Sequence, residues 1–152
     1  MNPSEKAIKL YKEEFNCSQA IFSAYAEELG IDEQTAVRVA SSFGGGIART
    51  GKTCGAVTGA LMVIGMKQWN SEKEKEEAKA HVYKLSNQLM DEFKARNKTL
   101  NCEELLGVSV ATPEGRAIVK ANQLTGKVCN RVINDVTEIL DSLMELPSKT
   151  IR

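Results

Sequence analysis

The sequence predicts an all-α fold, a single-domain helical bundle of about five to seven helices. Almost every segment repeats its apolar residues at intervals of three or four, and none alternates as a half-buried strand would. Capping residues precede several of these segments and glycines follow them. A chain of 152 residues can bury one sizeable core but not two. We therefore expect one cysteine-containing helical domain over residues 1–152, with its core at about 5–146.

The helix ends are predicted from capping residues, glycines and prolines. Asn16, Asp32 and Asn101 are good N-caps, and Gly30 and Gly107 suit the position after a helix. The expected helices comprise one that opens after Pro3-Ser4, Cys17 to Leu29, Asp32 to Phe43, about Thr53 to Trp69, Ser71 to about Lys98, a short turn CEELL after Asn101, one from Thr112-Pro113 toward Ala121, and a last helix that Pro147 ends.

The charge balance limits the kinds of partner. Lys plus Arg and Asp plus Glu are equal at 20 each, whereas nucleic acid and anionic membrane surfaces require a basic face. The longest apolar run, AVTGALMVIGM, is too short to span a bilayer and contains glycines. The start of the chain is charged and helical and does not resemble a signal peptide. We expect a cytoplasmic protein with no nucleic-acid partner and no membrane partner.

One stretch matches a phosphate-binding pattern. Residues 46–53 read GIARTGKT, which fits G-x-x-x-x-G-K-[ST]. Such a loop needs a buried parallel strand before it, but the preceding IDEQTAVRVASSF begins with a helix cap and contains polar residues throughout. We therefore interpret the match as coincidental. Arg49 and Lys52 could hold an anion, but no other feature of the sequence supports this.

The four cysteines are the unusual feature of the chain. They are Cys17, Cys54, Cys102 and Cys129, and no two of them are spaced as C-x-x-C. This spacing excludes a zinc ribbon, a thioredoxin motif and a ferredoxin run. Cys17 and Cys102 each follow an Asn cap, Cys54 lies at the start of a helix, and Cys129 lies where the last helix begins or is interrupted. Helix N-termini stabilise thiolates. The shared setting suggests that the fold brings the cysteines together.

The magnitudes indicate what such a cluster would require. A helix dipole contributes about 1 kcal/mol, which lowers a thiol pKa from about 8.5 by less than one unit. Two close thiolates repel each other by about 4 kcal/mol at an effective dielectric of about 20. Lys52 and Arg131, each two residues from a cysteine, offset only part of this repulsion. Four converging thiolates therefore imply a bound cation, an iron–sulfur unit, or thiols that pair as disulfides.

Gly55 and Gly59 are costly inside a helix, by about 1 kcal/mol each relative to alanine. They fit a close approach by a cofactor, and tight packing between helices explains them equally well. His81 and Trp69 lie on helices without a partner motif and are interpreted as structural.

The central CGAVTG, with one cysteine before it and two after it, resembles the redox-active protein family named for the pattern C…GCAxxG…C…C. Cys17 corresponds to the first cysteine, Cys54 with Gly55, Ala56 and Gly59 to the central motif, and Cys102 and Cys129 to the last two, over roughly residues 5 to 145. Thr53 stands where the family name has glycine. The resemblance implies redox or metal chemistry at the cysteines. A similar domain occurs in split-Soret cytochromes beside an iron–sulfur centre and haem, but the haem-attachment motif is missing here.

Three functions follow as hypotheses. In the first, Cys17, Cys54, Cys102 and Cys129 form one redox or metal site, with an iron–sulfur cluster ahead of zinc, and exchange electrons with a redox partner protein. In the second, the protein is a metal-free thiol–disulfide oxidoreductase or redox sensor with Cys54 as the nucleophile. In the third, it is an all-α interaction domain whose cysteines are buried hydrophobic residues. Glycine-rich helical faces often self-associate, so a homo-oligomer also stays open.

Overall fold

The computed structural model confirms the all-α fold class and describes the backbone of residues 1–151 and the side chains of residues 1–144. Within that part of the chain there are nine α-helices, more than predicted, and no strand. The helices are α1 (Pro3–Lys12), α2 (Cys17–Ala24), α3 (Ala26–Leu29), α4 (Glu33–Val39), α5 (Gly55–Gln68), α6 (Lys75–Asn97), α7 (Cys102–Leu106), α8 (Pro113–Ala121) and α9 (Asn130–Ile151).

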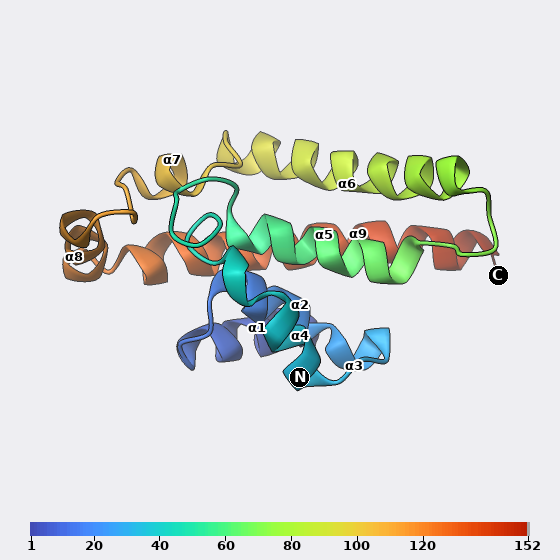
Figure 1. Ribbon diagram of the computed structural model, residues 1–152, viewed down its shortest axis with the longest axis horizontal. Coiled ribbons are helices and arrows are strands. Elements are labelled where there is room, and N and C mark those ends of the chain that lie inside the picture. The colour runs from blue at the N-terminus through green and yellow to red at the C-terminus, as the bar shows by residue number, and fades with distance from the viewer. Residues whose placement is uncertain (152) are drawn as a thin grey trace.

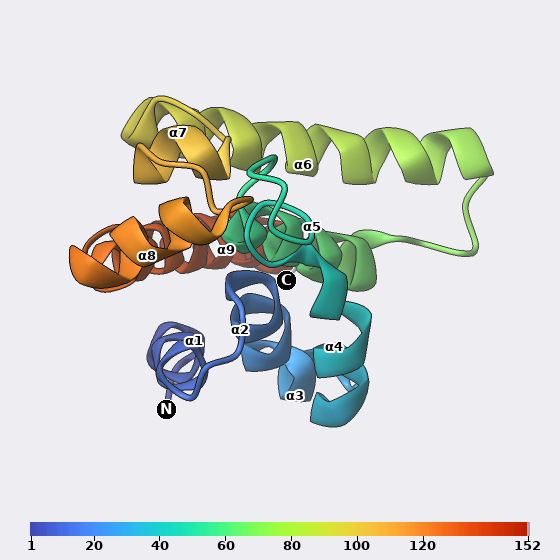
Figure 2. The same ribbon diagram turned by 60° about the vertical axis from the view of Figure 1, so that its left-hand side comes forward.

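The helices form layers (Figure 1). The three long helices α5, α6 and α9 pack on one another, and α6 runs antiparallel to the other two. The short helices α1, α2 and α3 lie against α5 or α9, α2 contacts both α1 and α5, and α4 packs on α2 and α3. Figure 2 shows α7 and α8 together at one end of the molecule, away from the turn that joins α5 to α6.

The core lies between α2, α5, α6 and α9. Its largest fully buried side chains come from all four, because each helix presents an apolar stripe to the others: Ile21, Tyr25, Val57, Val63, Ile64, Leu89, Phe93, Val132, Ile133, Val136, Ile139 and Leu140. None of the helices in the described part of the chain combines the length and the apolar character that a membrane span requires.

The predicted second helix, Cys17 to Leu29, is wrong in one respect, since it divides at Tyr25 into α2 and α3. Tyr25 has a φ of −98° and a ψ of 0° and is only 1% exposed. Its hydroxyl donates a hydrogen bond of 2.9 Å to Asp141 on α9. A contact with a distant helix thus accompanies the break, and the local sequence contains no sign of it.

Several predicted ends also differ. The third helix stops at Val39 and is followed by a 3-10 turn, η1 (Ser41–Phe43), while α6 begins at Lys75 and not at Ser71. The last helix continues past Pro147 to Ile151.

The connection between η1 and α5 contains the phosphate-loop pattern and follows an unusual path. Gly45, Gly46, Ile47, Ala48 and Arg49 all have positive φ, between 51° and 69°. Neither a strand before this loop nor a helix directly at its end is present, since η1 precedes it and α5 starts only at Gly55. The structure therefore supports reading GIARTGKT as a chance match, because a phosphate-binding loop needs both elements.

Candidate functional site

The loop before α5 aligns two of the cysteines through the backbone. Thr53 pairs with Asn101 in an isolated antiparallel bridge. The Cys54 N–H donates to the Leu100 carbonyl at 2.7 Å, and the Cys102 N–H donates to the Lys52 carbonyl at 2.6 Å. This pairing fixes the start of α5 beside the start of α7, and α5 consequently begins two residues later than predicted.

The other two cysteines come from α2 and from the start of α9. Cys17 is the first residue of α2, where Asn16 forms a capping box with Gln19. Cys129 ends a π-helical turn, η2 (Thr125–Cys129), that continues directly into α9. Cys129 therefore lies within a helix and not at a free N-terminus. A π turn inserts one extra residue into a helix and is frequent at functional sites, since it changes the direction of a side chain.

Cys17 and Cys129 lie close enough to each other that each thiol shifts the pKa of the other. The Cys17 thiol favours the Cys129 thiolate, and Cys17 itself is held in the protonated form. The Tyr11 hydroxyl on α1 lies near both thiols and lowers the pKa of each. Three segments that are distant in the sequence thus place two sulfurs and one phenol together.

The four thiols differ strongly in acidity. The Cys17 hydrogen bond, the Tyr11 hydroxyl and the charge of Arg131 lower the pKa of Cys129 to about 7, although burial opposes them. The Cys17 pKa is raised, first by its hydrogen bond to Cys129 and then by burial. Burial raises the pKa of Cys54 to about 12 and that of Cys102 to about 11.

Cys54 illustrates how burial outweighs a helix start. The N–H groups of Ala56 and Val57 face its sulfur and favour the thiolate. The residue is only 5% exposed, however, and the cost of burying a charge exceeds this gain. The Cys54 thiol, predicted as the nucleophile, is therefore less acidic than the thiols of Cys102 and Cys129. The acidic thiol is that of Cys129.

All four predicted cysteines lie in one neighbourhood, and Cys129 is their common neighbour. A negative charge on Cys129 raises the pKa of Cys17, Cys54 and Cys102. A charge on Cys54 also raises the pKa of Cys17. All four are free thiols. The donor set suits zinc or an iron–sulfur cluster chemically. Among the side chains that the structure describes, however, no three Cys, His, Asp or Glu lie close enough to hold one metal ion.

Gly55 and Gly59, predicted to face a cofactor, are covered by α2. A Cβ on Gly55 would lie 3.1 Å from the Cys17 Cβ, and one on Gly59 would lie 2.8 Å from the Ser18 carbonyl oxygen. The packing explanation therefore accounts for both glycines. Their absence of a side chain sets how closely Cys54 at the start of α5 approaches Cys17 at the start of α2.

Some residues of the site were not found by sequence reasoning. Nothing in the sequence around Tyr11 indicated that it would lie near two thiols. Arg131 had a signal, because a cation two residues from a cysteine can favour the thiolate. His81 lies 2.9 Å from the Gln68 side chain, and Trp69 is 43% exposed.

These features define a class, an all-α protein with four free cysteines in one neighbourhood, one of which is acidic. The chain belongs to the family described as "putative redox-active protein (C_GCAxxG_C_C)", which matches residues 15–143. The match confirms the predicted family, although it starts after α1. No curated protein and no solved structure matches the chain.

Proposed function

We propose that the chain is a thiol–disulfide redox protein whose reactive pair is Cys17 and Cys129. The observation that carries the proposal is the mutual effect of these two thiols on each other's pKa, which places them close together although they are 112 residues apart in the sequence and are supplied by α2 and η2. Neighbouring thiols are the arrangement from which a disulfide can form. The family description is consistent with this chemistry.

Cys129 is the attacking thiolate in this proposal. It is partly exposed, and with a pKa of about 7 it is substantially ionised at neutral pH, close to the optimum for thiol–disulfide exchange. Cys54 is buried and its thiol stays protonated under the same conditions. The role assigned to Cys54 from the sequence is therefore transferred to Cys129, with Cys17 as the resolving thiol.

The step balances as an exchange with a substrate disulfide. The Cys129 thiolate attacks one sulfur of the substrate, a mixed disulfide forms, and the first substrate thiolate leaves and takes up a proton. Cys17, having lost its proton to solvent, then attacks the Cys129 sulfur. The Cys17–Cys129 disulfide forms, and the second substrate thiolate leaves and is protonated. Two protein thiols are oxidised and one substrate disulfide is reduced to two thiols.

A metal or iron–sulfur centre, with electron transfer to a redox partner protein, is the second candidate function. The observation that favours it is the position of Cys129 as common neighbour of Cys17, Cys54 and Cys102. It requires the sulfurs to draw closer together than they lie in this structure. Cys54 and Cys102 would also have to lose protons that burial now favours.

One experiment separates the two candidates. The protein is purified anaerobically, its iron and zinc content and visible spectrum are measured, and its free thiols are counted before and after treatment with oxidised dithiothreitol. We expect no stoichiometric metal and a fall from four thiols to two, with peptide mapping that links Cys17 to Cys129. The Cys17→Ser and Cys129→Ser variants should lose this disulfide, whereas the matched Cys102→Ser variant should retain it.

The possible contrary results are distinct. Brown protein with stoichiometric iron, or bound zinc, would overturn the thiol–disulfide proposal in favour of the second candidate. Four thiols that resist the oxidant, or a disulfide between another pair, would also overturn it.

A further inference from the structure

A cleft lies directly beside the Cys17–Cys129 pair. It has a volume of about 690 Å³ and lies between the end of α1, the start of α2, the loop before α5, helix α8 and the start of η2. Neither cysteine lines the cleft, but three of its residues connect it to the pair: Tyr11 lies near both thiols, Asn16 directly precedes Cys17, and Thr125 lies one helical turn before Cys129. The volume is in the range of sites that bind small molecules.

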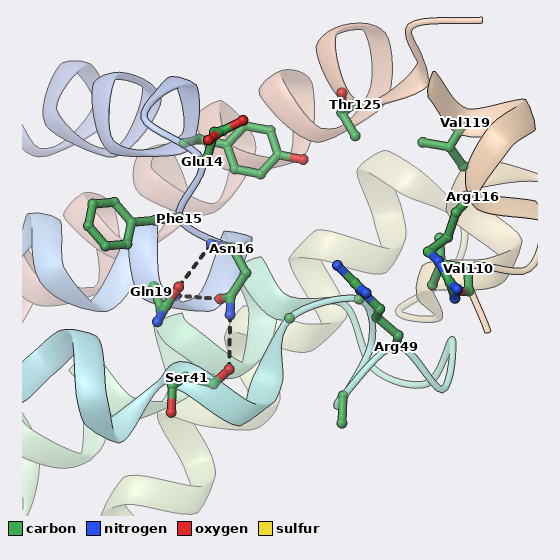
Figure 3. A pocket seen from close by; sticks show the side chains of 14 residues that line it. Glu14, Phe15, Asn16, Gln19, Ser41, Arg49, Val110, Arg116, Val119 and Thr125 are labelled. Atoms are coloured by element: carbon green, nitrogen blue, oxygen red, sulfur yellow. Dashed lines mark hydrogen bonds between the residues drawn. The ribbon is translucent and has the colours of Figure 1, made fainter. Parts of the chain in front are cut away.

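The charged residues of the cleft give it an excess of positive charge. Arg49 and Arg116 contribute two guanidinium groups and Glu14 a single carboxylate, and no other ionised side chain lines the cleft. Neither arginine forms an ion pair with a described side chain. Figure 3 shows the two arginines on one side, opposite Asn16, Gln19 and Ser41.

The two arginines are held in different ways. Arg116 donates from one Nη to the Val110 carbonyl at 2.9 Å, which fixes its position while leaving other N–H groups unused. Arg49 belongs to the left-handed loop, and Figure 3 shows its side chain extending from that loop toward the space between Asn16 and Thr125. A guanidinium with unused N–H groups can bind a carboxylate through two parallel hydrogen bonds.

We propose that this cleft binds a small disulfide that carries carboxylate groups, with Arg49 and Arg116 as the residues that select it. The inference rests on the proposed function, because it names the substrate class of the same thiol pair. A carboxylate held by the arginines leaves the rest of a small disulfide to extend past Tyr11 toward Cys129. Glu14 at the same cleft disfavours a second anionic group near α1 and so orients the substrate.

The test compares three small disulfides that differ in charge: dithiodipropionate with two carboxylates, neutral hydroxyethyl disulfide, and cationic cystamine. The rate at which the reduced protein forms its Cys17–Cys129 disulfide is measured with each. We expect dithiodipropionate to react about tenfold faster than cystamine, after correction for the rates of the same reagents with a free thiol. Added salt should reduce this preference, since exposed charges are screened.

Substitution of the arginines supplies the second arm. Arg49→Gln and Arg116→Gln should each lower the ratio of the dithiodipropionate rate to the hydroxyethyl disulfide rate by about threefold to tenfold. Arg38→Gln is the matched control, because Arg38 is exposed on α4 and does not line the cleft, and its ratio should equal that of the unaltered protein.

The results distinguish failure of this inference from failure of the proposed function. If hydroxyethyl disulfide forms the Cys17–Cys129 bond but charge has no effect, or if all three arginine variants behave alike, the cleft does not select carboxylates. If none of the disulfides oxidises the pair, the proposed function itself is wrong. Saturation by dithiodipropionate that persists in Arg49→Gln/Arg116→Gln would likewise overturn the assignment of these arginines.

Discussion

The two pairs of cysteines show how similar sequence settings lead to different chemistry. Cys17 and Cys102 each follow an Asn that caps a helix, and their neighbours across the fold are Cys129 and Cys54, respectively. In the first pair, Cys17–Cys129, the neighbouring Cys17 thiol is the main cause that lowers the pKa of Cys129 to about 7. In the second pair, Cys54–Cys102, the backbone is paired but burial raises both pKa values.

The difference lies in what each sulfur contacts. The Cys17 thiol, the Tyr11 phenol and the Arg131 guanidinium all favour the Cys129 thiolate. Together they overcome the cost of burying its charge. Cys54 receives only two backbone N–H groups, and burial prevails. A helix start alone is therefore insufficient to make a reactive thiolate, as its contribution of about 1 kcal/mol already suggests.

The largest predicted effect is the difference in alkylation rate between the pairs at neutral pH. At pH 7 about half of Cys129 is thiolate, whereas a pKa of about 12 leaves Cys54 almost entirely protonated. A thiolate of lower pKa is intrinsically less nucleophilic. On a logarithmic scale, this loss offsets about half of the rate advantage that Cys129 gains from its larger thiolate fraction. We still expect iodoacetamide to modify Cys129 at least about a hundredfold faster, as measured by site-resolved mass spectrometry.

The alkylation rates of Cys129 and Cys54 should depend on pH in different ways. The Cys129 rate should rise as pH increases through about 7 and then level off, because the thiolate form becomes saturated above its pKa. The Cys54 rate should still be rising at the highest pH at which the protein stays folded. Equal rates for the two residues, or an inflection for Cys129 near the ordinary thiol value, would contradict the distinction between the pairs.

The next effect concerns the stability of the interface between α2 and α5. This interface sets the distance between the Cys17–Cys129 pair and the Cys54–Cys102 pair. In Gly59→Ala the new Cβ would lie 2.8 Å from the Ser18 carbonyl oxygen and 3.0 Å from the Ile21 Cβ. We expect the free energy of unfolding to fall by about 2 kcal/mol in a denaturant titration, even though alanine favours the helix.

Gly65→Ala is the matched control on the same helix. A Cβ there meets nothing within 4 Å, so the helix propensity acts alone and should raise the free energy of unfolding by about 0.5 to 1 kcal/mol. If Gly59→Ala and Gly65→Ala change the free energy of unfolding by the same amount, the close approach of α2 is not the reason that position 59 requires glycine.

A smaller difference is expected between the two asparagine caps. The Asn16 side chain accepts from the Gln19 N–H at 2.9 Å and donates to the Ser41 carbonyl at 3.1 Å, whereas the Asn101 side chain accepts from the Glu104 N–H at 3.0 Å. Asn16→Ala should therefore lower the free energy of unfolding by about 1.5 to 2 kcal/mol and Asn101→Ala by about 1. Thermal unfolding of the two variants measures this, and the reverse order would contradict it.

The smallest effect concerns the loop that separates the Cys54–Cys102 pair from the cleft. Ala48 has a φ of 51°, which disfavours any residue with a Cβ. Ala48→Gly should therefore raise the free energy of unfolding by about 1 kcal/mol. Ala111→Gly offers a control in another exposed loop, outside the positive-φ set, and should lower stability or leave it unchanged. A loss of stability in Ala48→Gly would show that the left-handed path of the loop carries little strain.

Local signals in the sequence predicted much of the fold. Asp32 caps α4 through a bond of 3.1 Å from the Thr35 N–H, and Gly30 and Gly107 adopt the left-handed φ of 72° and 77° that ends a helix. These interactions join residues within one turn, so the sequence pattern contains both partners. The family match and the all-α class follow from the same kind of information, since both depend on spacing along the chain.

The candidate site could be predicted only in part. The four cysteines were identified from the sequence, but the reactive thiol was assigned to Cys54 because its helix start and Lys52 were visible nearby. The contacts that lower the Cys129 pKa come from α1 and α2, more than 100 residues earlier, and only Arg131 was near enough in sequence to be noticed. The burial that raises the pKa of Cys54 likewise depends on how α2 and α5 pack and on the bridge between Thr53 and Asn101.

The sequence by itself determined the helices, their caps and the cysteine pattern, because short-range hydrogen bonds and apolar periodicity are written into neighbouring residues. The tertiary structure alone decided which sulfurs touch, which one is acidic, and where a positively charged cleft opens beside them. Pairwise contact, burial and summed charge depend on segments that are far apart along the chain, and only the packed helices bring those segments together.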